Sequence, residues 1–219
     1  MIKSAKQLAI LATGLMLLAS CTKEEKTFIF NGKDLDNWET VLFDSTANPA
    51  EVFRVLDGVM RIAGSPFGYI MTRDVYGDYK LHVEWRWPEE PTNSGVFIHA
   101  QGINPSGWPV SVEAQLAHTK AGDLIFTGEG TGMHVGDSTY LTLPGQGRSS
   151  RVGRMEESSE NPAGEWNVYE ITCKGGSMEV LVNGVLQNTG TEGTRSSGRI
   201  ALQSEGGPIE FRNVYLVTL

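Results

Sequence analysis

The sequence predicts an all-β protein, built as a two-sheet antiparallel β-sandwich of the jelly-roll type. Three observations predict it: helical periodicity is nearly absent, short runs of alternating apolar and polar residues recur along the chain, and glycine, present 26 times, separates many of them. The runs are rich in β-branched residues, which fit the pleated surface of a sheet. Many short strands joined by tight turns favour a sandwich over a closed barrel.

The first 21 residues have the pattern of a bacterial lipoprotein signal peptide. Lys3 and Lys6 give a positive start, residues 8–18 form an apolar run too short to span a bilayer within the mature fold, and the sequence LASC ends at Cys21. We expect lipid on Cys21 and an anchor in the outer membrane of the cell envelope, on its periplasmic or its surface side. The alternative is an ordinary signal peptide with an incidental cysteine. Residues 22–27 are expected to form a flexible tether.

Residues 28–219 are expected to form a single domain, because no linker, charge block or low-complexity tract interrupts them. A chain of this length can bury a sizeable core. Strand-like runs follow one another along it, in this order: FRVLDGVMRIA, YIMTR, KLHVEWRW, SGVFIHA, VSVEAQLA, DLIFTG, WNVYEITC, SMEVLVNGVLQN, GRIALQSE and IEFRNVYLVTL.

Turn chemistry predicts where neighbouring strands pair. Asp57-Gly58 and Asn183-Gly184 tolerate the positive φ angles of tight hairpins, and Gly175-Gly176 joins two further runs. The segment from Gly128 to Ala163 is too long for a plain connection. We expect it to be a functional loop at the rim of the sandwich or a flexible one.

Composition excludes several classes of function. The net charge is −8 and no Lys/Arg-rich stripe occurs, which argues against a nucleic-acid partner. Cys173 is the one thiol left after Cys21, so it is expected to be a small buried hydrophobe, and no Cys/His spacing fits zinc. No HExxH, GxSxG or strand-glycine-helix unit is present, so no nicotinamide or flavin cofactor is expected. A divalent metal ion is left open.

Three neighbouring runs carry polar side chains at every second position, which places them on one face of each strand. The first run has Lys80, His82, Glu84 and Arg86, the second Ser94 and His99, and the third Ser111, Glu113 and Gln115. Such a row is ordinarily the solvated face of an antiparallel sheet. If the three runs align on one concave face, they form a trough of acid, base and amide groups, which suits a carbohydrate.

Glu113 is the leading candidate for a catalytic or binding carboxylate, because it lies in the middle of a strand between two apolar residues. A solvent-facing or ion-paired acid is the alternative. His99 is a candidate base or metal ligand, although it shares a face with Ser94 only if a bulge intervenes, and a structural histidine is the alternative. Glu84 and Arg86 are candidate binding groups, or an ion pair without such a role.

Further candidates lie in turns and loops. His118 and Asp123 flank a turn and could orient a base or bind a divalent ion, or be merely solvated. Asn93 shapes a turn and could bind a sugar hydroxyl. Trp108, between glycine and proline, offers a stacking surface, and His134 in the long segment is a weaker candidate for substrate contact.

The order of several motifs resembles the 3-keto-disaccharide hydrolase family. The matching residues are FNGKDLDNW, VLDGVMRI, YGDYKLHVEWRW, NSGVFIHA, VEAQLAHTKAGDLI, EWNVYEITCKGGSMEVLVNG and GRIALQSEGGPIEFRNVYL, and they extend from about Phe28 to the end. The resemblance implies a concanavalin-like jelly roll. It also implies an enzyme acting on 3-keto-glycosides or 3-keto-disaccharides that a separate sugar 3-dehydrogenase has oxidised.

The implied chemistry is elimination. A ketone at C3 acidifies the hydrogen on C2, so a base can remove it and the group on C1 can leave, with or without later addition of water. Glu113 and His99 are the leading acid and base candidates for this chemistry, with His118 as a further candidate. Arg86, Glu84, Asn93, Gln115, Trp108, Asp123 and His134 are then expected to bind the substrate.

Two other functions remain open at the level of sequence. A jelly roll can serve equally well as a non-catalytic, lectin-like carbohydrate-binding module, which requires exposed aromatics and amides without a base in reach. A surface scaffold that docks a protein would instead present a flat sheet face with no cleft. The enzyme requires titratable groups that converge in a cleft, at least one with a perturbed pKa.

Overall fold

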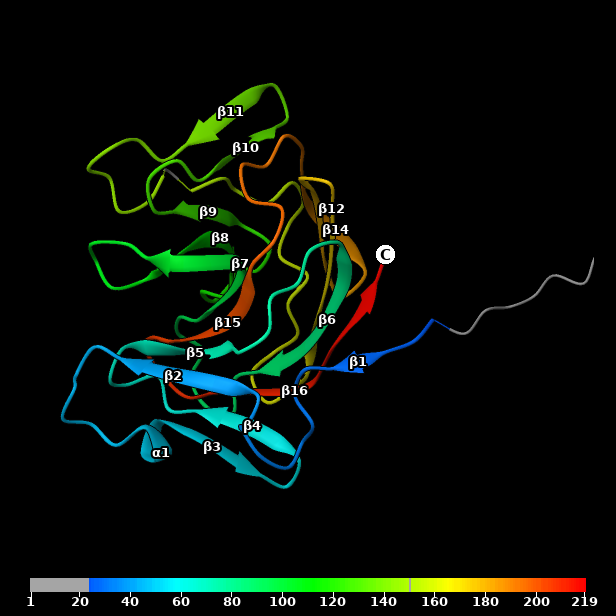
Figure 1. The fold of residues 1–219 in the computed structure, drawn as a ribbon. Helices are drawn as coiled ribbons and strands as arrows, with labels where there is room; N and C mark the ends of the chain where they lie inside the picture. The colour runs from blue at the N-terminus through cyan, green and yellow to red at the C-terminus, as the bar shows by residue number, and fades with distance from the viewer. Residues whose placement is uncertain (1–23, 150) are drawn as a thin grey trace, which may run out of the picture.

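The computed structural model describes residues 24–149 and 151–219, and it confirms the predicted β-sandwich (Figure 1). The expected signal peptide and Cys21 lie outside the described residues. Two antiparallel sheets face each other, and in residues 24–149 and 151–219 helix is confined to one turn, α1 (Pro49–Val52). Within the described part of the chain, no helix is long and apolar enough to cross a membrane.

One sheet has eight strands. Its order is β14 (Val185–Gly190), β13 (Ser177–Val182), β12 (Asn167–Lys174), β6 (Tyr79–Arg86), β16 (Ile209–Thr218), β4 (Val59–Ile62) and β3 (Phe53–Leu56), with β1 (Thr27–Phe28) also paired to β16. The other sheet has six strands. Its order is β2 (Trp38–Leu42), β5 (Gly68–Thr72), β15 (Arg199–Ser204), β7 (Gly95–Ile103), β8 (Pro109–Gln115) and β9 (Leu124–Thr127).

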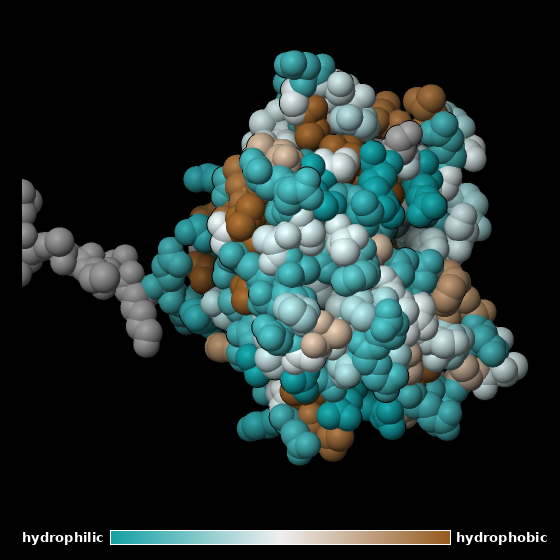
Figure 2. All heavy atoms as spheres, turned by 180° about the vertical axis from the view of Figure 1, so that it is seen from behind, coloured by the Kyte–Doolittle hydropathy of each residue, from teal (hydrophilic) through white to brown (hydrophobic). Residues whose placement is uncertain are grey.

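The hydrophobic core fills the space between the two sheets. Trp85 and Trp87 are fully buried there with Phe126 and Phe211. Cys173 is buried as predicted, and burial raises the pKa of its thiol to about 12, so it stays protonated and apolar. The surface seen from behind is mostly hydrophilic, with hydrophobic residues in small groups (Figure 2).

The three predicted tight turns are confirmed. Asp57 and Gly58 have φ angles of 53° and 79°, Asn183 and Gly184 of 50° and 81°, and Gly175 and Gly176 of 55° and 82°. Two successive residues with positive φ match the right-handed twist of the strands that they join. These turns fix the register of β3 with β4, of β13 with β14 and of β12 with β13.

The long segment after β9 has a structure of its own. It contains the hairpin of β10 (Gly132–Val135) and β11 (Ser138–Leu141), and then returns along the outer edge of β9. There the backbone N–H of Ser149 donates to the Phe126 carbonyl at 2.8 Å, and that of Val152 to the Leu124 carbonyl at 2.9 Å. We call residues 147–149 and 151–152 the edge segment.

Candidate functional site

The expected trough across three runs does not form, because the runs belong to different sheets. β6 lies in the eight-stranded sheet, whereas β7 and β8 are neighbours in the six-stranded sheet. The apolar residues of β6 point into the core, so its polar row faces outward on the far side of the sandwich. Glu84 and Arg86 are therefore separated from Glu113 by the whole core.

Glu84 and Arg86 are held in ion pairs on the outer face of the eight-stranded sheet. Arg86 Nε lies 2.7 Å from Glu210 Oε2, and Arg212 Nε lies 2.6 Å from Glu84 Oε2. The guanidinium groups of Arg86 and Arg212 also lie 4.6 and 4.0 Å from the ring centre of Trp166. The expected role of Glu84 and Arg86 in substrate binding is therefore corrected. Both residues belong to a structural network of ion pairs, which was the alternative expectation.

A pocket of about 630 Å³ opens on the outer face of the six-stranded sheet. Four of the predicted site residues line it: Asn93, Trp108, Glu113 and Gln115. The rest of the lining was not predicted from the sequence. It comes from the loop before β8, the end of β9, the edge segment with the residue before it, and β15 with the residue after it: Asn104, Ser106, Thr127, Gln146, Gly147, Arg148, Arg151, Gln203 and Glu205.

Glu113 lies deep in this pocket, with 4% of its side chain exposed. The Glu113 side chain has room because Gly95, on β7 diagonally across from it, has no side chain: a Cβ atom on Gly95 would lie 2.7 Å from Glu113 Oε1. The amide oxygen of Gln115 accepts from the backbone N–H groups of Leu116 and Ala117, both at 2.8 Å. The amide nitrogen is then the part of Gln115 that can donate to Glu113.

Burial, together with the negative charge of Glu205, raises the pKa of Glu113 to about 8. Arg148, Arg151 and the hydrogen bond from Gln115 act in the opposite direction and are outweighed. At neutral pH the carboxyl of Glu113 is therefore mostly protonated. A buried carboxylic acid in a polar pocket is suited to donating a proton.

Among the residues that the structure describes, two amide oxygens in the pocket have no hydrogen-bond partner. Gln203 Oε1 and Asn93 Oδ1 are both buried and both unpaired, although nearly all buried polar atoms in proteins are hydrogen-bonded. Each can accept a hydrogen bond from a ligand hydroxyl. Glu205, directly after β15, forms a β-bridge with Asn93, and burial raises the pKa of its carboxyl while Arg148 opposes the shift.

The positive charge of the pocket comes from the edge segment, because Arg148 and Arg151 extend from it. Asp123 lies behind the pocket: its Oδ2 is 3.7 Å from Arg151 Nη1, and its Oδ1 accepts from the backbone N–H of Arg154 at 2.9 Å. The expected contact of Asp123 with substrate is corrected, since its carboxylate is buried against these groups. It holds Arg151 instead.

A group of aromatic residues lies next to the pocket on the outer face of the six-stranded sheet. The Trp108 ring lies 4.6 Å from that of Phe43, 5.9 Å from that of Phe97 and 6.4 Å from that of Tyr69, centre to centre. Asn104 fixes the loop, because its side-chain oxygen accepts from the backbone N–H of Trp108 at 3.2 Å. Trp108 is thus held in place at the pocket wall by its loop and by the neighbouring rings.

The three histidines expected at the site lie outside the pocket. A bulge in β7, with a φ of 52° at His99, turns this residue so that Nδ1 lies 3.1 Å from the Arg195 carbonyl and Nε2 3.1 Å from the Gly77 carbonyl. Burial lowers the pKa of His99, and the two carbonyls oppose the shift. The catalytic role expected for His99 is corrected to a structural one.

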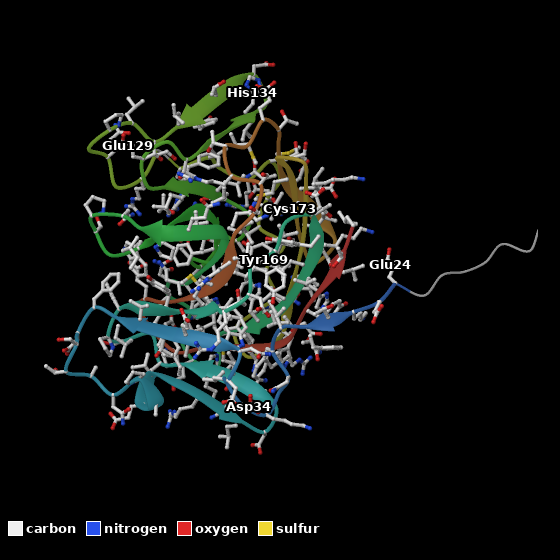
Figure 3. All side chains as sticks on the ribbon, viewed as in Figure 1. Glu24, Asp34, Glu129, His134, Tyr169 and Cys173 are labelled. Atoms are coloured by element: carbon white, nitrogen blue, oxygen red, sulfur yellow. The ribbon has the colours of Figure 1, made fainter. Side chains whose placement is uncertain are left out.

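His118 is half exposed, with Nδ1 3.7 Å from Glu160 Oε2, so it is not the partner of Asp123. His134 lies on the β10–β11 hairpin (Figure 3), where Nδ1 is 2.9 Å from Thr139 Oγ1. Neither residue lines the pocket, which corrects both expectations. No group of three or more His, Cys, Asp or Glu side chains in the described residues is arranged to hold a metal ion.

Tyr169 braces the site from the opposite sheet. It lies between the two sheets (Figure 3), donates its hydroxyl proton to the Gln115 carbonyl and accepts from the backbone N–H of Gly122 at 2.7 Å. A fully buried hydroxyl with both a donor and an acceptor partner resists displacement. The end of β8, and with it Gln115 beside Glu113, is therefore fixed through the core.

Comparisons with known proteins agree with this fold. A family model described as a 3-keto-alpha-glucoside-1,2-lyase-like domain matches residues 25–217. A solved structure from Parabacteroides distasonis ATCC 8503, described as a candidate glycosyl hydrolase, has 25% identity and a TM-score of 0.62 and covers 89% of this chain and 100% of its own. A second one from the same organism has 21% identity and a TM-score of 0.64, covering 89% and 94%.

A carbohydrate-binding module from Bacillus subtilis shares the fold at 10% identity and a TM-score of 0.52, over 83% of this chain and 96% of that one. Among curated proteins, no sequence matches the chain.

Proposed function

The chain belongs to the 3-keto-alpha-glucoside-1,2-lyase-like family, as its ordered motifs predicted, and from this premise we propose that it cleaves the glycosidic bond of 3-keto-glycosides or 3-keto-disaccharides. The observation that carries the proposal is Glu113, a buried carboxylic acid with a pKa raised to about 8, inside a pocket with unpaired amide oxygens. Acid groups tuned in this way are typical of catalytic sites.

Cleavage of a 3-keto-glycoside has specific chemical needs. Removal of the C2 proton gives an enolate, which expels the oxygen on C1. The reaction therefore requires a base, a positive group near the enolate oxygen and an acid for the leaving oxygen. Glu113 supplies the acid, and Arg148 and Arg151 supply the positive charge.

The remaining lining residues suit a sugar. Asn93 and Gln203 accept hydrogen bonds from hydroxyl groups, which would satisfy their unpaired oxygens. Trp108 stacks on the apolar face of the ring. Water that adds to the eliminated product would make the net reaction a hydrolysis, and release without water would make it a lyase reaction.

The substrate must arrive already oxidised at C3, so a separate sugar 3-dehydrogenase acts before this protein. The pattern that ends at Cys21 supports a lipid-anchored protein of the cell envelope, in the outer membrane. Incorporation of a radiolabelled fatty acid in cells that express the full chain tests the anchor. Loss of the label in Cys21→Ala is the expected result, and label retained in that variant would contradict it.

The experiment that tests the function compares a synthetic 3-keto-glucoside with the plain glucoside. Only the keto substrate should be cleaved, and Glu113→Gln should lower kcat by about 100- to 10,000-fold, the range of general acid–base catalysis. Thermal unfolding of both proteins checks that the variant is folded. Equal cleavage of both substrates would instead support an ordinary glycosidase with paired carboxylates.

A non-catalytic carbohydrate-binding module is the second candidate. It is favoured by the unpaired amide oxygens beside Trp108, a combination that also suits sugar binding without chemistry. Calorimetric titration with the 3-keto-glucoside distinguishes the two functions. Binding without any release of product would favour the module, and product release would exclude it.

A further inference from the structure

We propose that Glu205 is the second catalytic carboxylate and takes the proton from C2, while Glu113 serves as the acid for the leaving oxygen. The inference rests on the proposed function. It assigns the catalytic base, which the reaction requires and which Glu113, as the acid, does not supply. No base was recognised in the sequence at this position, because Glu205 follows the run GRIALQS and precedes two glycines, as a surface turn residue would.

Elimination among the lining residues points to Glu205. The described residues that line the pocket include four ionisable side chains, Glu113, Glu205, Arg148 and Arg151. An arginine side chain stays protonated and cannot act as the base. His99 and His118, the bases expected from the sequence, lie elsewhere. Once Glu113 holds a proton, Glu205 is the remaining group that can accept one.

The strand order places the two carboxyl groups around a gap. β7 lies between β15 and β8. Because Gly95 on β7 has no side chain, the Glu113 carboxyl occupies the space beside it. Glu205 forms a β-bridge with Asn93, which lies two residues before Gly95, the first residue of β7. Both carboxyl groups line the same pocket of about 630 Å³, which is large enough to receive a sugar ring beside the acid and the base.

The surroundings of the two carboxyls differ in the way that these roles require. Glu113 is almost fully buried and is hydrogen-bonded by Gln115, whereas Glu205 is partly exposed. Within the described residues the Glu205 carboxylate has no hydrogen bond and no ion pair, and Arg148 is the cation that acts on it. The negative charge on Glu205 in turn keeps the proton on Glu113, so one group is the acid and the other the base.

The proton and electron balance closes with these two groups. The Glu205 carboxylate removes the C2 proton, and the C–H electrons form the enolate, whose oxygen at C3 is negative. Re-formation of the C3 ketone makes the C1–C2 double bond and breaks the bond from C1 to the leaving oxygen, which takes the proton of Glu113. No oxidation or reduction occurs.

Addition of water reverses both protonation states. The Glu113 carboxylate removes a proton from water as the oxygen bonds to C1, and Glu205 returns its proton to C2. Hydration therefore restores the starting state without help from solvent, whereas the lyase reaction needs a proton to pass from Glu205 to Glu113 through water before the next turnover.

Exchange of the C2 hydrogen isolates the step assigned to Glu205. The probe is 3-keto-1,5-anhydroglucitol, a keto sugar with no leaving group on C1, which is incubated with enzyme in D2O and followed by proton NMR. The wild-type protein should catalyse exchange. Glu205→Gln should lose exchange and cleavage of the 3-keto-glucoside by about 100-fold or more. Glu113→Gln should lose cleavage but keep exchange within about fivefold.

Two further variants guard the interpretation. Glu205→Asp keeps a carboxylate but withdraws it by one methylene, so slowed but detectable exchange is expected, which a loss of folding would not give. Glu179→Gln removes an exposed glutamate on β13 and should change neither rate.

Exchange that persists in Glu205→Gln while the wild-type enzyme cleaves would overturn the inference and leave the proposed function standing. A wild-type protein that neither exchanges nor cleaves would overturn both. Loss of exchange in Glu113→Gln, with exchange kept in Glu205→Gln, would assign the base to Glu113.

Discussion

The outer faces of the two sheets look alike in sequence but differ in how their polar groups are satisfied. On the eight-stranded sheet, Glu210 forms ion pairs with Arg61 and Arg86, and Glu84 accepts from Arg212 and Asn213, so the charges of these two carboxylates are neutralised by neighbours. On the six-stranded sheet, Gln203 and Asn93 keep unpaired oxygens. A polar row that completes its own hydrogen bonds is structural, whereas one that leaves bonds open is built for a ligand.

The largest expected effect concerns stability and pH. The pKa of Glu113 is about 8 in the folded protein and near 4.5 when unfolded, so the folded state holds the extra proton between these values. The stabilisation from the protonated Glu113 carboxyl is complete below pH 4.5 and is lost as pH rises toward 8. The charged groups that face this carboxyl are Glu205, Arg148 and Arg151. Glu113→Gln keeps the neutral form, and should be more stable than wild type by about 4 kcal/mol at pH 8.

Urea unfolding at pH 5 and pH 8 measures this difference. The advantage of the variant should be small at pH 5, where the wild-type carboxyl is protonated as well. An equal difference at both pH values would show that Glu113 is not protonated in the fold, and would remove the main contrast between the two faces.

Substitution of one arginine on each outer face should show that only the face of the six-stranded sheet contributes to kcat. Arg148→Ala removes positive charge from the pocket and should lower kcat on the 3-keto-glucoside by about 100-fold, within the range found for groups that stabilise an anionic transition state. Arg212→Ala breaks an ion pair on the other face and should leave kcat within about threefold. Equal losses would mean that the outer face of the eight-stranded sheet takes part in function.

Glu210 should matter for stability and not for chemistry. Its side chain is 3% exposed and lies 2.9 Å from Arg61 Nε and 2.7 Å from Arg86 Nε. Glu210→Gln leaves both arginines with a weaker acceptor, so the free energy of unfolding should fall by about 2 kcal/mol. Chemical denaturation measures it, and an unchanged kcat in the folded variant is the matching control.

The smallest effect is expected at Trp108. Trp108→Ala removes the stacking surface and should raise KM about tenfold with little change in kcat, since Glu113 and Glu205 stay in place. Trp166→Ala is the matched change on the other face, where the ring stacks with two arginines. It should leave KM unaltered, and a KM that moved equally in both variants would contradict the comparison.

Local periodicity was enough to predict most strands and part of the pocket. The alternation in VSVEAQ places Glu113 and Gln115 together on the outer face of β8, because side chains alternate along any strand. Asn93 and Trp108 followed from turn and loop chemistry. The short strands β2, β10 and β11 were not predicted. Each has only four or five residues, several of them exposed, so none shows a clear alternation of apolar and polar residues.

The choice of sheet could not be predicted from local pattern. β6 pairs with β12 and β16, which lie far along the chain, and alternation is the same whichever sheet a strand joins. His99 was misplaced for a different reason: a bulge changes which way a side chain points. Arg148 and Arg151 carry no periodic signal, because the hydrogen bonds of the edge segment with β9 position them.

The edge segment has a consequence for solubility. β9 is the last strand of its sheet, and an uncovered last strand offers free N–H and C=O groups to which another molecule can add by strand pairing. The edge segment occupies part of those groups with its own backbone. The stretch that carries the pocket arginines therefore also shields the sheet against aggregation, so a deletion there would remove a protective cover as well as two charges.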